Sequence, residues 1–137
     1  MAQRYKEEIT EEIPEVDAVL GTTSYGDIVK ALNEAEAGHV FQEFKDINAL
    51  PEDSGRRVIT TGGHFGYLKI AEGCDKHCTY CIIPSLRGKF RSVPEERLLK
   101  QAEYMASQGV RELILVAQET TVYGTDLYGK KNSAYPS

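Results

Sequence analysis

The sequence lacks any long apolar run. Its 137 residues contain no stretch that approaches the ~20 apolar residues of a transmembrane helix. The first ten residues have no apolar stretch after their basic residues, so they do not resemble a secretory signal. Internal repeats are also absent. Hydrophobic residues make up 41 % and charged residues 27 %, which is typical of a globular protein and excludes a disordered, collagen-like or membrane chain.

Cysteine is scarce, and its three copies are clustered. Cys74, Cys78 and Cys81 lie within eight residues of one another. An odd, tightly spaced set is a poor disulfide framework, and thiols in a chain without a signal indicate a reducing compartment. We therefore expect a cytoplasmic protein whose cysteines have a metal or redox role. Thiolates favour zinc, copper(I) or iron–sulfur clusters, and three in one short loop can converge on one point.

The absence of a fourth cysteine limits the kind of metal site. Structural zinc normally has four ligands, so a zinc site would need a histidine, and the candidates are His77 and His64. His77 adjoins Cys78, which makes a four-ligand geometry awkward. A 4Fe–4S cluster held by three cysteines instead leaves one iron open for a small molecule. A non-catalytic zinc module stays open as the alternative.

Charge is unevenly distributed along the chain. Residues 1–54 carry 4 basic and 13 acidic side chains, whereas residues 55–137 carry 12 basic and 8 acidic ones. This asymmetry indicates two units with different roles. The net charge of −5 gives no whole-chain case for nucleic-acid binding, so no direct nucleic-acid site is expected.

The first part of the chain predicts a piece of a parallel α/β fold. Apolar periodicity indicates a helix, a buried strand and a second helix, over residues 3–13, 16–20 and 26–36. Three apolar side chains of the second helix are expected to face inward: Ile28, Val29 and Leu32. Thr23 or Ser24 is expected to cap that helix, and Gly38 to end it. Residues 39–63 are rich in turn signals, and we interpret them as an interdomain connection with one short strand at 57–60.

The second part predicts a β–loop–α–β unit. A strand is expected at 67–71, followed by a loop over 72–91 that holds every cysteine and that Asp75 caps. Ser92 to Glu95 have the pattern of a capping box, which starts a helix that runs to Gln108 and ends at Gly109. The apolar run 112–117 predicts a strand buried on both faces. Two strands alone would expose their edges and half of their core.

The cysteine motif resembles a known family. Cys74-x3-Cys78-x-Tyr80-Cys81 matches the signature of the radical S-adenosylmethionine (SAM) enzymes. This resemblance implies that the three cysteines hold a 4Fe–4S cluster whose open iron chelates SAM. It also implies that the reduced cluster, supplied with electrons by a reductant such as flavodoxin, cleaves SAM to a 5′-deoxyadenosyl radical. The protein then positions the cofactor.

The flanking segments narrow the resemblance to the methylthiotransferase branch. Residues 67–74 and 82–88 and the segment Gln118-Glu119-Thr120-Thr121-Val122-Tyr123-Gly124 follow the ribosomal, RimO-like arm and not the tRNA-modifying, MiaB-like arm, which is the alternative. Residues 2–131 carry the resemblance. It implies methylthiolation of an aspartate in the twelfth small-subunit ribosomal protein.

The resemblance also suggests SAM contacts beyond the cysteines. Tyr80 would lie near the adenine, and Arg87 would contact the SAM carboxylate or the substrate. Gln118 and Glu119 follow the second strand, where radical SAM enzymes bind the SAM amino group with a Gly-Gly-Glu motif that this chain lacks. No residue is assigned a catalytic role.

The resemblance finally implies a domain plan. Residues 1–38 would be the C-terminal remnant of the methylthiotransferase N-terminal domain, 39–63 the linker, and 64–137 the first βα units of a partial TIM-like radical SAM barrel. The family's N-terminal domain holds a second 4Fe–4S cluster on three further cysteines, which this chain lacks. We therefore expect a fragment of an enzyme, incomplete and inactive alone.

Overall fold

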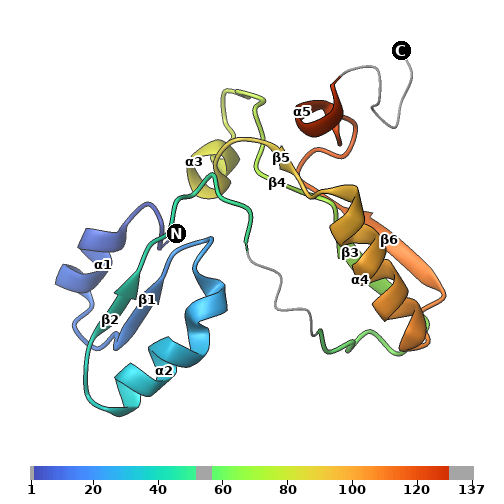
Figure 1. Ribbon diagram of the computed structural model, residues 1–137. Helices are drawn as coiled ribbons and strands as arrows, with labels where there is room; N and C mark the ends of the chain where they lie inside the picture. The colour runs from blue at the N-terminus through green and yellow to red at the C-terminus, as the bar shows by residue number, and fades with distance from the viewer. Residues whose placement is uncertain (1, 52–56, 130–137) are drawn as a thin grey trace. The chain divides into compact units, whose positions relative to one another are not determined.

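The computed structural model describes residues 2–51 and 57–129, and its elements are drawn in Figure 1. By internal contacts, the described chain forms two compact units. The first comprises residues 2–51 and 77–88, and the second comprises 57–76 and 89–129. The expected mixed α/β fold with parallel strands is confirmed, whereas the barrel stays a prediction. Contact units are not the same as domains, so the division into 1–38, 39–63 and 64–137 also stays a prediction.

The first unit contains a parallel strand pair with one helix along it. Strand β1 (Ala18–Leu20) pairs with β2 (Phe41–Glu43), with Ala18 opposite Phe41. Parallel neighbours need a crossover connection, and here η1 (Tyr25–Asp27) and α2 (Ile28–Glu36) provide it (Figure 1). A short helix α1 (Lys6–Glu12) precedes β1. The expected helix–strand–helix order is confirmed, but β2 lies inside the segment that the sequence analysis treated as a connection.

The prediction of the inward face of α2 is wrong. Ile28, Val29 and Leu32 are each at least half exposed, and Ala31 is the buried residue of the helix. The described part of this unit places only two strands beside α2, so a narrow stripe of the helix is covered. Gly38 does follow the end of the helix, in the left-handed conformation at φ +79°.

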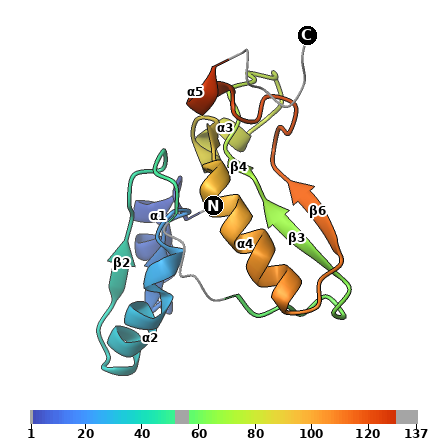
Figure 2. The same cartoon turned by 45° about the vertical axis from the view of Figure 1, so that its right-hand side comes forward.

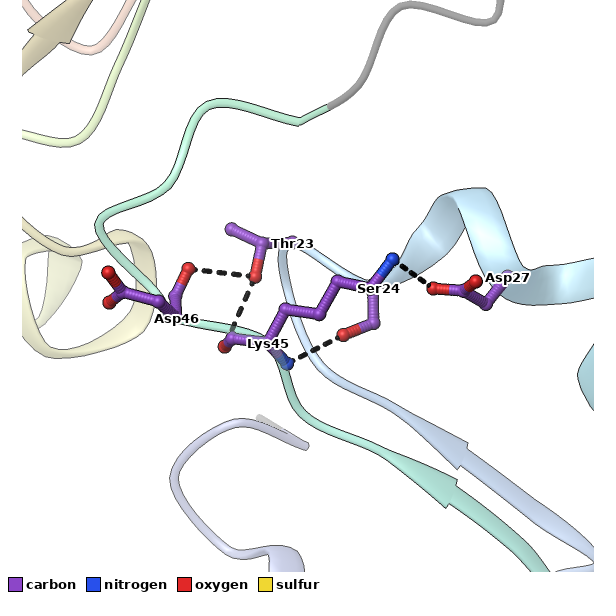
Figure 3. A network of polar contacts seen from close by, with 5 residues as sticks. All are labelled: Thr23, Ser24, Asp27, Lys45 and Asp46. Atoms are coloured by element: carbon purple, nitrogen blue, oxygen red, sulfur yellow. Dashed lines mark hydrogen bonds and ion pairs between the residues drawn. The ribbon is translucent and has the colours of Figure 1, made fainter.

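The caps expected from Thr23 and Ser24 are also wrong. The Thr23 hydroxyl lies 3.3 Å and 3.1 Å from the carbonyl oxygens of Lys45 and Asp46, and the Ser24 hydroxyl accepts the Lys45 N–H at 2.9 Å (Figure 3). The Lys45 ammonium also pairs with Asp27 at 2.6 Å. Both hydroxyls are buried. They tie the loop after β1 to the chain after β2, so they are not available to cap η1 or α2.

The second unit is a β–α–β piece with a packed core. Strand β3 (Phe65–Lys69) pairs in parallel with β6 (Glu112–Val116), and α4 (Glu95–Ser107) lies along the pair in both views (Figures 1 and 2). The core residues come from β3, from α4 and from residues that flank them: Leu68, Ile70, Leu98, Met105 and Val110. A Cβ on Gly66 would lie 2.4 Å from the Met105 methyl carbon, so glycine leaves room for the tip of the Met105 side chain against β3.

Most element boundaries in this unit are confirmed, with three corrections. Strand β6, which was expected to be buried on both faces, is exposed along its length, and β3 is its partner among the described strands. Residues 57–60 form no strand; instead the Arg57 guanidinium donates to the Tyr67 carbonyl of β3. The capping box is wrong because Pro94 occupies the N-cap position of α4 and makes no side-chain cap.

A short hairpin closes the cysteine loop. Strand β4 (Ala71–Glu72) runs antiparallel to β5 (Arg91–Ser92), with Glu72 opposite Arg91. Helix α3 (Ile83–Arg87) lies inside the loop, and α5 (Thr125–Tyr128) contacts β5. Neither the hairpin nor these helices was predicted, since each is shorter than six residues. In the described residues no helix is long and apolar enough to cross a membrane.

Candidate cluster-binding loop

The three thiols lie on the loop between β4 and β5. Cys74 is buried, with 9 % of its surface exposed, whereas Cys78 is exposed and Cys81 is half-buried. All three are free cysteines. A turn in which the Cys81 N–H donates to the Cys78 carbonyl at 3.0 Å sets the spacing of the last two. A set of three free thiols without a disulfide is chemically suited to a soft metal or an iron–sulfur cluster.

The loop is shared by the two contact units. Cys74 is in the second unit, whereas Cys78 and Cys81 are in the first. Across residues 2–51 and 57–129, no three His, Cys, Asp or Glu side chains are grouped so as to hold a metal ion. The donor set therefore fits a cluster, but the ligand-free loop is not arranged as a closed metal site.

The start of the loop is held by two side chains that follow Cys74. The Asp75 carboxylate accepts the Phe90 N–H at 2.9 Å, which joins the two ends of the loop across 15 residues. This bond matches the expectation that Asp75 caps the loop. Next to it, the Lys76 ammonium forms an ion pair with the Glu119 carboxylate. The segment around Cys74 is thus fixed to the second unit.

The Lys76–Glu119 pair forms at one edge of the strand pair. Since β3 and β6 are parallel and Lys69 lies opposite Val116, the chain leaves both strands at the same edge. In parallel α/β folds this carboxyl edge is where ligands bind. The hydrogen bond from Lys76, together with those from the Thr121 hydroxyl and N–H, lowers the pKa of Glu119 from 4.5 to about 2. Beside it, the side-chain oxygen of Gln118 is buried without a hydrogen-bond partner among the described residues.

The remaining predicted SAM contacts lie in the other unit. Tyr80 is 95 % exposed, and Arg87 is a half-buried residue of α3. The Thr22 hydroxyl holds this helix by donating to the Leu86 carbonyl at 3.0 Å. Nothing in the structure brings Tyr80 or Arg87 to Gln118 and Glu119, so their roles stay predictions.

The histidines considered as zinc ligands are differently placed. His64 directly precedes β3, and its carbonyl accepts the Arg111 and Glu112 N–H groups at 2.8 Å and 3.0 Å. The cysteine loop follows the other end of that strand, so His64 is not expected to share a metal ion with these thiols. His77 is exposed beside Cys78. The third histidine of the chain, His39, lies 3.1 Å from Glu34 on the surface.

The sequence analysis missed the contacts that hold the segment after Gln118. The buried Ser92 hydroxyl donates to Asp126 at 2.6 Å and accepts the Gly124 N–H at 2.8 Å, while the Ser92 N–H donates to the second Asp126 oxygen at 2.8 Å. The Tyr123 hydroxyl donates to the Val93 carbonyl at 2.9 Å. These bonds give the Tyr-Gly part of the motif a structural role, and no local sequence signal pairs Ser92 with a residue 34 positions later.

Comparison with known proteins finds a superfamily and a set of relatives to which this chain is similar. Residues 68–132 match the model of the Radical SAM superfamily. Three curated relatives bear the name ribosomal protein uS12 methylthiotransferase RimO. The one from Lachnoclostridium phytofermentans is 61 % identical over 131 residues, the one from Clostridioides difficile 50 % over 131, and the one from Thermoanaerobacter sp. 44 % over 130.

These relatives are much longer than this chain. Each alignment includes at least 95 % of the chain but only 30 % of the relative, so the chain spans about 30 % of their length. The match to the superfamily model begins within β3 and contains the whole cysteine motif. Residues 68–132 are thus similar to the radical SAM superfamily, and almost the whole chain is similar to part of the RimO methylthiotransferases.

Proposed function

We propose that this chain is the cluster-binding part of a radical SAM methylthiotransferase that modifies ribosomal protein uS12. The observation that carries this proposal is the cysteine loop. Three free thiols in the x3 and x2 spacing follow β3 and β4, at the carboxyl edge where β3 pairs in parallel with β6. Cys74, Cys78 and Cys81 would hold a 4Fe–4S cluster.

SAM would bind at the same edge. When bound, the cluster and SAM together supply a 5′-deoxyadenosyl radical, and the residues of this chain supply binding and orientation. Glu119 is fully ionised near neutral pH because its pKa is about 2, so its carboxylate can accept hydrogen bonds from the SAM ammonium. The buried oxygen of Gln118 is a second acceptor. Tyr80 would contact the adenine, and Arg87 the SAM carboxylate or the substrate.

The substrate and partners are assigned through the relatives. Their names specify uS12, which supports the ribosomal arm over the tRNA-modifying arm. The complete protein would act in the reducing cytoplasm with a reductant such as flavodoxin. One cluster uses all three cysteines of this chain, so it offers no thiolates for a second cluster. The reaction therefore requires parts of the longer protein, and this chain is expected to be inactive alone.

Cluster binding can be measured on the chain itself. After anaerobic reconstitution with iron and sulfide, we expect about four irons and four acid-labile sulfides per chain. Replacing any one of Cys74, Cys78 or Cys81 with alanine should abolish loading, whereas His77→Ala should leave it unchanged. A folded wild-type chain that binds no iron would contradict the proposal. Tight zinc binding that His77→Ala abolishes would replace it with a zinc module.

A further inference from the structure

The best-held part of the cysteine loop is the stretch just after Cys74. Asp75 accepts the Phe90 N–H, and Lys76 pairs with Glu119. Of the three residues that separate Cys74 from Cys78, two therefore make side-chain contacts within the second unit. Cys74 itself is buried, whereas Cys78 is exposed.

The charge and burial of the pair suit an anchoring role. The Glu119 side chain is 13 % exposed and accepts three bonds, from Lys76 and from the Thr121 hydroxyl and N–H. The carboxylate is thus fixed by the backbone just after β6. The Lys76 side chain is 61 % exposed, so it can reach Glu119 without the cost of burying its ammonium. A fixed carboxylate and a solvated ammonium form a clamp between the loop and the strand end.

Such a clamp would lower the entropic cost of metal binding. A free loop must lose backbone conformations when its ligands close on a metal, and a loop fixed beforehand loses fewer. The clamp acts on Cys74 because Cys74 and Lys76 belong to the same contact unit as Glu119. It does not act on Cys78 in the same way, since residues 77–88 belong to the first unit.

We propose that Lys76 is a positioning residue, which, by pairing with Glu119, keeps Cys74 in place for metal binding before any metal is present. The role of the clamp in metal binding rests on the proposed function. The contact between Lys76 and Glu119 does not depend on a bound metal. Glu119 then has a role through Lys76 that is separate from any contact with SAM.

The reaction of the three thiols with iodoacetamide tests this in the reduced, metal-free chain. Alkylation at each cysteine is followed over time and located by tandem mass spectrometry. We expect Lys76→Met to accelerate alkylation of Cys74 by roughly two- to fivefold, the range that an exposed ion pair can supply. Alkylation of Cys78 should not change, since its side chain is already exposed. Lys76→Arg should retain the wild-type rate at Cys74.

Two further variants test whether Lys76 and Glu119 act through one shared interaction. Glu119→Gln should accelerate Cys74 alkylation as much as Lys76→Met, and the double variant should add nothing further, because both remove one interaction. Lys100→Met removes an equivalent charge from the exposed face of α4 and should have no effect. Circular dichroism on every variant verifies that the chain is folded.

The outcomes distinguish the anchoring from the proposed function. Unchanged Cys74 alkylation in folded Lys76→Met, or equal acceleration at Cys74 and Cys78, would overturn the anchoring whatever the iron content. Failure of the wild-type chain to load iron, with Cys74 alkylation accelerated as expected, would overturn the cluster proposal alone. If both hold, iron should also load more slowly into Lys76→Met than into Lys76→Arg.

Discussion

The two β–α–β pieces of this chain have the same topology but are stabilised differently. In the second unit, α4 buries Leu98 and Met105, and Gly66 leaves room for the tip of the Met105 side chain. In the first unit, α2 buries only Ala31, and the strand pair is instead tied by buried hydroxyls of the loop after β1. A parallel strand pair can thus be held by helix packing in one case and by loop hydrogen bonds in the other.

Among the substitutions that test this comparison, removing a core side chain should lower the free energy of unfolding the most. Met105→Ala leaves a cavity between α4 and β3, and we expect it to lower the free energy of unfolding by about 2–5 kcal/mol. Leu32→Ala on α2, whose side chain is 55 % exposed, should change it by less than about 0.5 kcal/mol. Urea unfolding of each variant provides the measurement. Similar losses for the two variants would mean that α2 is packed as α4 is.

A glycine in the cysteine loop offers the next test. Gly88 ends α3 at φ +75°, and a Cβ there would lie 2.9 Å from the Ile47 carbonyl oxygen. Gly88→Ala should cost about 1–3 kcal/mol for a backbone at φ +75° and ψ −167°, which is essentially restricted to glycine, and roughly 1–3 kcal/mol for the collision. Gly38→Ala is the control for a positive-φ glycine without a collision, since it has φ +79° and no atom lies within 4 Å of the added Cβ.

The difference between these two glycine variants combines the collision with the backbone cost that is particular to Gly88. It should appear as a lower urea midpoint for Gly88→Ala than for Gly38→Ala. Equal midpoints would show that the chain around Ile47 yields to an added methyl group, and that α3 is loosely held in the first unit.

The hydroxyl contacts of the first unit can be broken one at a time. Ser24→Ala removes the acceptor of the Lys45 N–H at a fully buried position, and we expect a loss of about 1–2 kcal/mol in unfolding free energy. Ser107→Ala removes an exposed hydroxyl that donates to the Tyr104 carbonyl, and it should change little. An equally small effect of Ser24→Ala would remove the contrast between the two units.

The sequence predicted elements better than it predicted what covers them. Glycines 38 and 109 correctly end their helices, because the left-handed backbone is a local property. The inward faces of α2 and β6 were wrong because burial depends on the neighbouring strands, which local periodicity does not reveal. Strand β2 was missed because its three residues lie among turn signals.

The candidate site shows the same contrast between local features and contacts of residues that are distant in sequence. The three cysteines could be identified from their spacing alone, since the chemistry of the set depends on the residue types and their separation. The Lys76–Glu119 pair joins residues 43 positions apart and could not be found from a local pattern. It required the parallel register of β3 and β6, which brings the two loops to one edge.

The smallest expected effect is electrostatic and also belongs to that edge. Glu119 has a pKa of about 2 in the folded chain and 4.5 as its ordinary value, because Lys76 and Thr121 stabilise the carboxylate. A lowered pKa contributes stability that is fully present above pH 4.5 and is lost as the pH falls toward 2.

The urea midpoint of Glu119→Gln should therefore lie below that of the wild type at pH 6, and the difference should shrink as the pH falls toward 3. Because the Lys76 side chain is mostly exposed, 1 M salt should also reduce this difference. A difference that stayed constant from pH 6 to pH 3 would mean that Glu119 does not titrate against Lys76 in the folded chain, and the edge would then be held by the strand pair alone.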